Sequence, residues 1–354
     1  MSAGARIAPV APRVGWVDDA RGIGIVLVVV GHTLPGLWNA GVIGDGGPQR
    51  FLVDWIYAFH MPLFFFLSGL FATRAADEPY RALVATKLRT IAYPYVVWSI
   101  LQTLMQVALS GLTNKPASPW SLLTVAWLPI MQFWFLYALF LIVLVVGALQ
   151  RLGARPPLIA ALAAALYAYP HWGTLGSWGV AYSVANHMLY FAAGLLVAAS
   201  LPAWVARLTP ARAALVMVAG FGGIALAVAA GAQHGAVRTP LLALLGTAAT
   251  LALAATLHRT GRTGVLGAWG RSSLQIYVGH SMASAGYRIA LQRVLGVTAA
   301  APHVVGGIAV GLLAPLALNW LCERLGFRYA FSWPKPSAGR PHGALSARAT
   351  STSA

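Results

Sequence analysis

Long apolar stretches follow one another along most of the chain, separated by short polar segments. A helix that crosses a bilayer needs about 20 mostly apolar residues, because the hydrocarbon core is about 30 Å thick. Ten windows approach this length: residues 20–38, 51–71, 88–109, 133–150, 157–169, 180–201, 212–230, 240–258, 272–289 and 303–325. The fifth is short and the ninth is polar. The pattern predicts an all-α, polytopic membrane protein with about ten transmembrane helices.

The composition supports this interpretation. Of the 354 residues, 59% are hydrophobic and only 9% are charged, and the mean hydropathy is +0.72. An average soluble domain has roughly 25% charged residues. The chain is therefore expected to divide into an N-terminal tail (1–19), a transmembrane domain (20–325) and a C-terminal tail (326–354). The last is rich in Ser, Ala, Pro and Arg and is expected to be largely disordered.

The basic residues are distributed unevenly between the two sides of the predicted membrane. If the N-terminus is cytoplasmic, 19 of the 24 Lys and Arg residues lie on the cytoplasmic side, which leaves Arg50, Lys115, Arg238, Arg288 and Arg293 outside. Such an excess marks cytoplasmic loops, so both termini are predicted to be cytoplasmic. The net charge of +17 thus reflects topology and argues against a nucleic-acid partner. A basic inner face would also attract anionic lipid head groups or a polyanionic cofactor.

Two ionisable side chains, Arg21 and His32, interrupt the first apolar window. Eleven positions along a helix turn the chain roughly 20° past three full turns and advance it about 16 Å, so both side chains share one face at different depths. Burying such groups in hydrocarbon costs a few kcal/mol each, which makes a functional site the default interpretation. A buried helix-packing pair is the alternative. Asp18 and Asp19, just before the window, are expected to cap the helix.

The second window adds His60 and Pro62. Pro62 should kink the helix, because proline lacks the backbone N–H that a helix uses. His60 could face the same cavity as His32, or it could be a core histidine bonded to a neighbouring helix. Ser68 is a further candidate near the site, although Ser68-Gly69 is also typical of close helix packing.

Further polar groups occur between and within the later windows. Lys87 and Arg89 belong to a basic loop that could bind the phosphates of a nucleotide-like cofactor or could simply fix the topology. Asn186 and His280 lie within the sixth and ninth windows, where each is costly unless it is paired or hydrated. No HExxH, CxxC, Walker or GxSxG pattern occurs, so no metal, nucleotide-hydrolase or serine-hydrolase site is predicted.

Several segments together resemble one protein family, the membrane-bound acyltransferase family 3, and within it the fucose 4-O-acetylase-like branch. The segments are Arg21-x10-His32, FHMPLFFFLSG at residues 59–69, LRTIAYPYVVWS at 88–99, WFLYALF at 134–140 and SLQIYVGH at 273–280. The resemblance implies a multi-pass enzyme of the bacterial cytoplasmic (inner) membrane. It would move an acyl group, usually acetyl, from acyl-CoA to a hydroxyl of a glycan, a glycan precursor or a lipid-linked sugar.

The resemblance also implies roles for the candidate residues. His32 would be the general base that deprotonates the acceptor hydroxyl, or would carry the acyl group as a covalent intermediate. Arg21 would hold the phosphates of the donor, acetyl-CoA or another acyl-CoA, together with Lys87 and Arg89. His60 would be a further catalytic residue. His280, Asn186 and Ser68 are second-tier candidates for supporting His32, and no bound cofactor is expected.

Two other kinds of protein remain as alternatives. A proton-coupled transporter also uses ionisable residues at mid-membrane. However, the chain shows no clear inverted repeat, and its only intramembrane carboxylate is Asp54, near an interface. A non-catalytic membrane subunit or sensor is the second alternative, and it predicts no binding of an acyl donor.

Overall fold

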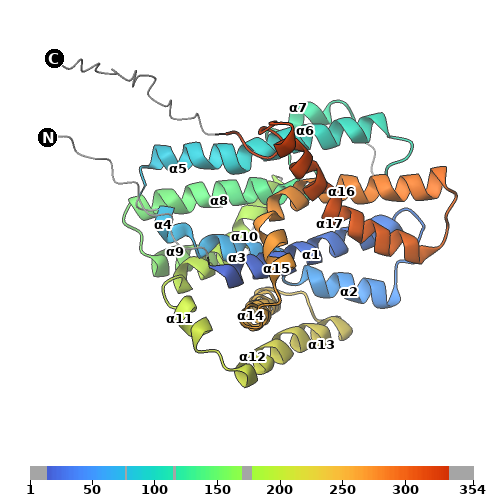
Figure 1. Ribbon diagram of the computed structural model, residues 1–354. Helices are drawn as coiled ribbons and strands as arrows, with labels where there is room; N and C mark the ends of the chain where they lie inside the picture. The colour runs from blue at the N-terminus through green and yellow to red at the C-terminus, as the bar shows by residue number, and fades with distance from the viewer. Residues whose placement is uncertain (1–13, 76–77, 115–116, 170–177, 335–354) are drawn as a thin grey trace, which may run out of the picture.

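Helices form all the regular structure of the described residues. The computed structural model describes residues 14–75, 78–114, 117–169 and 178–334, and no strand occurs within these ranges (Figure 1). The all-α class predicted from the sequence is therefore confirmed.

The helices differ widely in length. The longer ones are α1 (Gly15–Trp38), α2 (Gly47–Tyr57), α3 (His60–Gly69), α5 (Tyr80–Lys87), α6 (Tyr93–Ala108), α8 (Trp134–Arg151), α9 (Pro156–Ala168), α10 (Gly179–Val197), α12 (Pro210–Met217), α14 (Arg238–Arg259), α15 (Gly264–Arg271), α16 (Ser273–Ile289) and α17 (Ala300–Arg324). The shorter ones are α4 (Ala72–Ala75), α7 (Ser121–Thr124), α11 (Leu201–Ala206), α13 (Gly223–Ala229), the 3-10 turn η2 (Met131–Phe133) and the π-helical turns η1 (Leu88–Ala92), η4 (Val218–Gly222) and η5 (Ala290–Val294).

Seven helical stretches among the described residues are long and apolar enough to cross a bilayer. They are Gly15–Trp38, Gly47–Gly69, Met131–Arg151, Gly179–Val197, Pro210–Ala229, Arg238–Arg259 and Ala300–Arg324. The other three expected spans fall on η1 followed directly by α6 (5 and 16 residues), on α9 (13 residues) and on α16 (17 residues). A helix of 13 residues extends about 20 Å, less than the hydrocarbon thickness of about 30 Å. The helices fit a multi-pass membrane protein with seven stretches that meet this length and composition, and the count of about ten spans and the cytoplasmic position of both termini stay predictions.

The second expected span consists of two helices, α2 and α3, which meet close to Pro62. α2 ends at Tyr57 and α3 begins at His60, and Phe59 between them has a φ of −144°. Pro62 has no N–H to donate to the carbonyl four residues earlier, so the helix is not continuous at this point. The break places His60 at the first position of α3, beside the end of α2.

Helix α1 lies in the middle of the bundle. It packs against α14, α15, α16 and α17 as well as α2 and α3 (Figure 1). Its apolar positions Ile25, Val28 and Val29 are completely buried. Because Arg21 and His32 belong to this helix, both are carried by the best-packed element of the fold.

The first turns of α1 differ from the sequence-based expectation. The helix begins at Gly15, so Asp18 and Asp19 lie inside it and the prediction that they cap its N-terminus is wrong. Val17 is buried in an apolar cluster, and this packing extends the helix upstream of the aspartates. Asp18 instead forms an ion pair with the Arg21 guanidinium at 3.6 Å, and Asp19 accepts a hydrogen bond from His258 Nδ1 at 2.7 Å.

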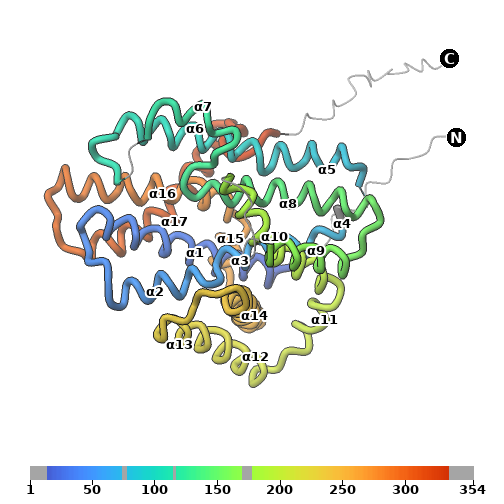
Figure 2. The backbone as a smooth tube through the Cα atoms, turned by 180° about the vertical axis from the view of Figure 1, so that it is seen from behind, coloured from blue at the N-terminus to red at the C-terminus, as the bar shows by residue number. Residues whose placement is uncertain are grey.

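Helix α14 runs across the other long helices. Figures 1 and 2 both look nearly along its axis, whereas α1, α8 and α12 lie across the view. Its first turn carries Thr239, and its last turn carries His258, which bonds Asp19 of α1. The last turn of α14 is thereby bonded to the beginning of α1.

The chain after α17 returns to pack on α6. Trp98 donates its indole N–H to the carbonyl of Ala330 at 2.8 Å, and Phe331 is buried and stacks on Trp98. Tyr93 donates its hydroxyl to the carbonyl of Tyr329 at 2.9 Å. The expectation of disorder for residues 335–354 lies outside the described residues, as does the expected tail before residue 14.

Two glycines bring α3 and α10 into close contact. A Cβ built on Gly69 would overlap the carbonyl oxygen of Phe191, and one built on Gly194 would overlap the carbonyl oxygen of Phe66. Small residues of this kind allow helix backbones to approach closely in a membrane. The contact fixes the position of α3, which carries His60, relative to α10, which carries Asn186 and His187.

Candidate active site

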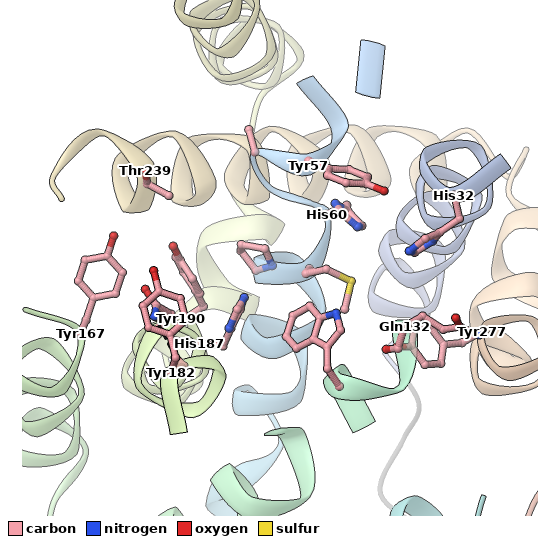
Figure 3. A pocket seen from close by; sticks show the side chains of 15 residues that line it. His32, Tyr57, His60, Gln132, Tyr167, Tyr182, His187, Tyr190, Thr239 and Tyr277 are labelled. Carbon is pink, nitrogen blue, oxygen red and sulfur yellow. Dashed lines mark hydrogen bonds between the residues drawn. The ribbon is translucent and has the colours of Figure 1, made fainter. Parts of the chain in front are cut away.

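A cavity lies where α1, α2, α3, α8, α9, α10, α14 and α16 meet, and we call it the histidine cavity. Its volume is about 320 Å³. The lining residues are His32, Tyr57, Ala58, His60, Met61, Pro62, Gln132, Trp134, Tyr167, Tyr182, Asn186, His187, Tyr190, Thr239 and Tyr277. Figure 3 shows His32 and His60 near one end and Tyr167, Tyr182 and Tyr190 near the other. The lining contains no carboxylate, lysine or arginine; it consists of histidines, aromatic residues, neutral polar groups and the apolar Ala58, Met61 and Pro62.

The hydrogen bonds of His32 determine which of its nitrogens is basic. Nδ1 lies 2.9 Å from the carbonyl oxygen of Val28, one turn earlier on α1. A carbonyl can only accept, so Nδ1 carries the proton of the neutral imidazole and Nε2 keeps a lone pair. His32 can therefore act as a base through Nε2 while its ring is held through Nδ1.

His280 of α16 provides a second support for His32. Nε2 of His280 lies 3.2 Å from Nδ1 of His32, and Nδ1 of His280 donates to the carbonyl of Tyr277 at 2.7 Å. The same reasoning makes Nε2 of His280 an acceptor, which also receives the Ser281 hydroxyl at 3.1 Å. An imidazole oriented by a third group is a common arrangement around a general base.

His60 and His187 repeat the local pattern of His32. Nδ1 of His60 lies 2.9 Å from the carbonyl of Ile56, and Nδ1 of His187 lies 2.8 Å from the carbonyl of Ser183. Each ring is thus anchored to its own backbone one turn away and keeps a basic Nε2. Three imidazoles of this tautomer line one cavity.

Tyr57 fixes the wall between His32 and His60. Its hydroxyl donates to the carbonyl of Gly31 at 2.7 Å, and its ring centre lies 5.0 Å from that of His60 and 6.3 Å from that of His32. The Tyr57 ring can approach α1 this closely because Gly31 has no side chain. A Cβ at this position would lie 2.9 Å from the ring. The residue before His32 therefore has a packing reason to be glycine.

A second, smaller cavity lies at another level, between α3, α4, α5, α8 and α10, and we call it the lysine cavity. Its volume is about 60 Å³, and the lining residues are Ser68, Phe71, Ala72, Lys87, Val143, Val146, Gly147, Gln150 and Phe191. On α3 and α8, Ser68 and Val143 follow His60 and Trp134 by eight or nine residues, about 12–14 Å of helix. Phe65 lies between the levels, with its ring centre 4.7 Å from that of His187.

Charged and unpaired polar groups surround the lysine cavity. Burial lowers the pKa of the Lys87 ammonium from its ordinary value, and the Glu78 carboxylate partly opposes this shift. Arg21 does not line the histidine cavity, and its guanidinium carbon lies 5.4 Å from the ring centre of Phe71. The side-chain oxygen of Gln150 is buried and has no hydrogen-bond partner among the described residues. These groups suit a ligand with both anionic and N–H groups.

The other predicted site residues have the following positions. Asn186 lines the histidine cavity, with its amide donating to the Tyr182 carbonyl at 2.8 Å. Ser68 lines the lysine cavity, but its hydroxyl donates to the Phe64 carbonyl at 2.8 Å within its own helix. Arg89 lines neither cavity, and its carbonyl accepts the backbone N–H of Trp333.

Sequence reasoning did not select His187, Gln132 or Tyr57 as site residues. His187 adjoins Asn186 and follows Ser183 by one helical turn, so the polar cluster in that apolar window was a usable signal. Gln132 precedes the aromatic run at residues 133–135, and Tyr57 is an ordinary aromatic residue in the sequence. Nothing in the local pattern separates these two from interfacial residues.

The fold and the cavity define a class of protein: a multi-pass, all-helical membrane protein with a histidine-lined internal cavity. Residues 14–320 match the acyltransferase domain of acyltransferase family 3. The chain belongs to this family and is an acyltransferase. No curated protein and no solved structure gave a significant match.

Proposed function

We propose that the protein transfers an acyl group, acetyl in the simplest case, from acyl-CoA to a hydroxyl of a glycan or glycan precursor. The observation that carries this proposal is the anchored His32, which directs a basic Nε2 into a cavity lined by neutral polar and aromatic groups. A cavity of about 320 Å³ is at the small end of ligand sites, which suits one sugar unit better than a long chain.

His32 would act as the general base of the reaction. Nε2 takes the proton of the acceptor hydroxyl as its oxygen attacks the thioester carbonyl carbon, and the C=O electron pair moves onto oxygen. Collapse of this intermediate re-forms C=O and breaks the C–S bond, and the departing thiolate takes the proton from Nε2. A positioned general base contributes typically 10²- to 10⁴-fold. His280 would stabilise the transient imidazolium by accepting from its Nδ1.

The donor would enter at the lysine cavity, on the predicted cytoplasmic side. Lys87 and the neighbouring Arg21 supply positive charge for the phosphates. The unpaired oxygen of Gln150 can accept an amide N–H of the pantetheine arm. The separation of about 12–14 Å between the two levels is within the reach of that arm, which would have to pass Phe65.

Replacement of the buried lysine tests this placement of the donor. Lys87→Met is expected to raise the KM for acetyl-CoA about tenfold with little change in kcat, because it removes a charge that binds donor and transition state equally. Arg81→Met is the matched control, since Arg81 is on the same helix, is exposed and does not line the cavity. An equal effect of both substitutions would contradict the placement and indicate general surface electrostatics.

The proposed function is tested by CoA release from acetyl-CoA. The protein is purified in nanodiscs as the Cys322→Ser variant, which removes its only thiol, and is mixed with acetyl-CoA and a set of methyl glycosides. We expect glycoside-dependent appearance of free CoA thiol. Stabilisation by CoA without turnover would contradict acyl transfer to these acceptors. Proton uptake into proteoliposomes without release of CoA thiol would support the transporter alternative. Absence of both CoA binding and turnover would support a non-catalytic membrane subunit or sensor.

A further inference from the structure

We infer that the side-chain amide of Gln132 and the indole N–H of Trp134 form the oxyanion site of this reaction. The inference rests on the proposed acyl transfer at His32, since an oxyanion forms only when a nucleophile attacks a carbonyl. Both residues line the histidine cavity: Gln132 belongs to η2, and Trp134, two positions later, is the first residue of α8.

Gln132 has one N–H left for a ligand. The residue is 4% exposed, and its Nε2 donates to Oε1 of Gln102 at 2.8 Å while its own Oε1 faces Gln102 Nε2 at 3.4 Å. A primary amide carries two N–H groups, and this pairing uses one of them. The second N–H is a neutral donor on a cavity wall, with its orientation fixed by the paired amide of α6.

Trp134 supplies the second donor. Its ring is held between neighbours, with centroids 4.9 Å from His187 and 6.3 Å from Phe65. The indole N–H of Trp134 has no acceptor among the described residues, and Trp134 is the only tryptophan in the described lining of the cavity. An indole N–H can only donate, so a ligand atom that accepts would complete it.

An unusual backbone conformation presents these two side chains. Met131, the residue before Gln132, has a φ of +42°, and it is the only non-glycine residue with positive φ in the described ranges. Such conformations cost roughly 1–3 kcal/mol and tend to occur at functional sites. The Met131 sulfur accepts from the amides of Gln102 and Gln106 at 3.2 and 2.9 Å, so α6 holds the strained turn in place.

One chain of bonds connects Gln132 to His32. Tyr277 donates its hydroxyl to the backbone carbonyl of Gln132, and the carbonyl of Tyr277 accepts Nδ1–H of His280. His280 in turn bonds His32. Helix α16 thus positions both the base and the amide donor, and Figure 3 shows Gln132 beside Tyr277 on the side of the cavity where His32 lies.

The chemistry requires donors of this kind. When the acceptor oxygen bonds the thioester carbon, a full negative charge develops on the former carbonyl oxygen, and His32 has already become cationic. The described lining has no Lys or Arg to stabilise that oxygen. Preorganised neutral N–H donors in a site with little water serve this purpose, and loss of one such donor costs about 10²–10³ in kcat.

The test uses isosteric variants of Gln132 in the CoA-release assay with acetyl-CoA and methyl glycosides. Gln132→Met keeps the size and removes the donors, so kcat should fall about 100-fold with KM for acetyl-CoA unchanged. Gln132→Glu should be slower still, because a carboxylate would repel the oxyanion. Trp134→Phe keeps the ring but lacks the N–H and should lose about tenfold or more in kcat.

Gln49→Met is the matched control, because Gln49 lies near the start of α2, does not line the cavity and makes no bond to the turn at Met131. Thermal unfolding of each variant identifies any that fail to fold, and Trp134→Phe supplies the test independently of Gln132. A kcat for both Gln132→Met and Trp134→Phe within about threefold of wild type would overturn the inference, as would a loss confined to KM. Absence of turnover in the wild-type protein would instead refute the proposed function.

Discussion

Replacement of His32 by glutamine is expected to abolish most acyl transfer, with kcat for CoA release reduced about 10²–10⁴-fold. Glutamine can keep a hydrogen bond to the Val28 carbonyl through its amide, but it has no basic nitrogen, so the acceptor proton has no recipient. The KM for acetyl-CoA should change little, because the donor's phosphates are assigned to the lysine cavity. The measurement is steady-state CoA release in nanodiscs.

The control for His32 is His234→Gln, since His234 is exposed in the loop before α14 and does not line the cavity. A kcat of His32→Gln within threefold of wild type would show that His32 is not the base. The covalent alternative is separated by incubating the protein with labelled acetyl-CoA alone. An acyl-histidine leaves label on the wild-type protein and none on His32→Gln, whereas general-base catalysis leaves both unlabelled.

The contact of α3 with α10 should be disrupted by a single methyl group added to either glycine at the contact. Gly69→Ala and Gly194→Ala each place a Cβ on a facing backbone carbonyl, which cannot move aside as a flexible side chain can. Over-packing costs about 1–3 kcal/mol and occasionally more. We expect each variant to unfold at clearly lower temperature in detergent and to lose activity, because the helices that carry His60 and His187 are forced apart.

Gly286→Ala provides the comparison for these variants. It lies inside α16, and a Cβ there has no neighbouring atom within 4 Å. Alanine is favoured over glycine in a helix by roughly 0.5–1 kcal/mol, so this variant should be as stable as wild type or slightly more stable. Equal melting temperatures for Gly69→Ala and Gly286→Ala would mean that α3 and α10 do not meet as closely as described.

The sequence predicted the helical elements well, because apolar runs of this length rarely adopt any structure other than a helix. Arg21 and His32 were expected on one helix, and α1 carries both. A kink at Pro62 was also expected, because a missing N–H is a property of the residue itself, and the structure has a break between α2 and α3 close to it. The count of spans was less predictable, since a short apolar helix such as α9 and a crossing helix such as α14 give similar hydropathy signals.

The composition of the site was only partly predictable. His32, His60 and Asn186 were chosen because polar groups in apolar windows are costly, and the fold brings them to one cavity. Lys87 lines the lysine cavity instead, and Arg21 lies beside Phe71 of that cavity. These positions depend on how α3, α5 and α8 pack, which the sequence does not show. The turn at Met131 had no sequence signal, because positive φ is normally indicated by Gly or Asn.

The central claim is that this chain forms an ester from acyl-CoA at His32. The most direct measurement is recovery of labelled acetyl on a methyl glycoside after incubation with labelled acetyl-CoA and the nanodisc-embedded protein. We predict an alkali-labile acetyl ester on the glycoside with the wild-type protein and with His234→Gln, and none above background with His32→Gln. Equal ester formation by His32→Gln, or no ester with the wild-type protein, would contradict the account.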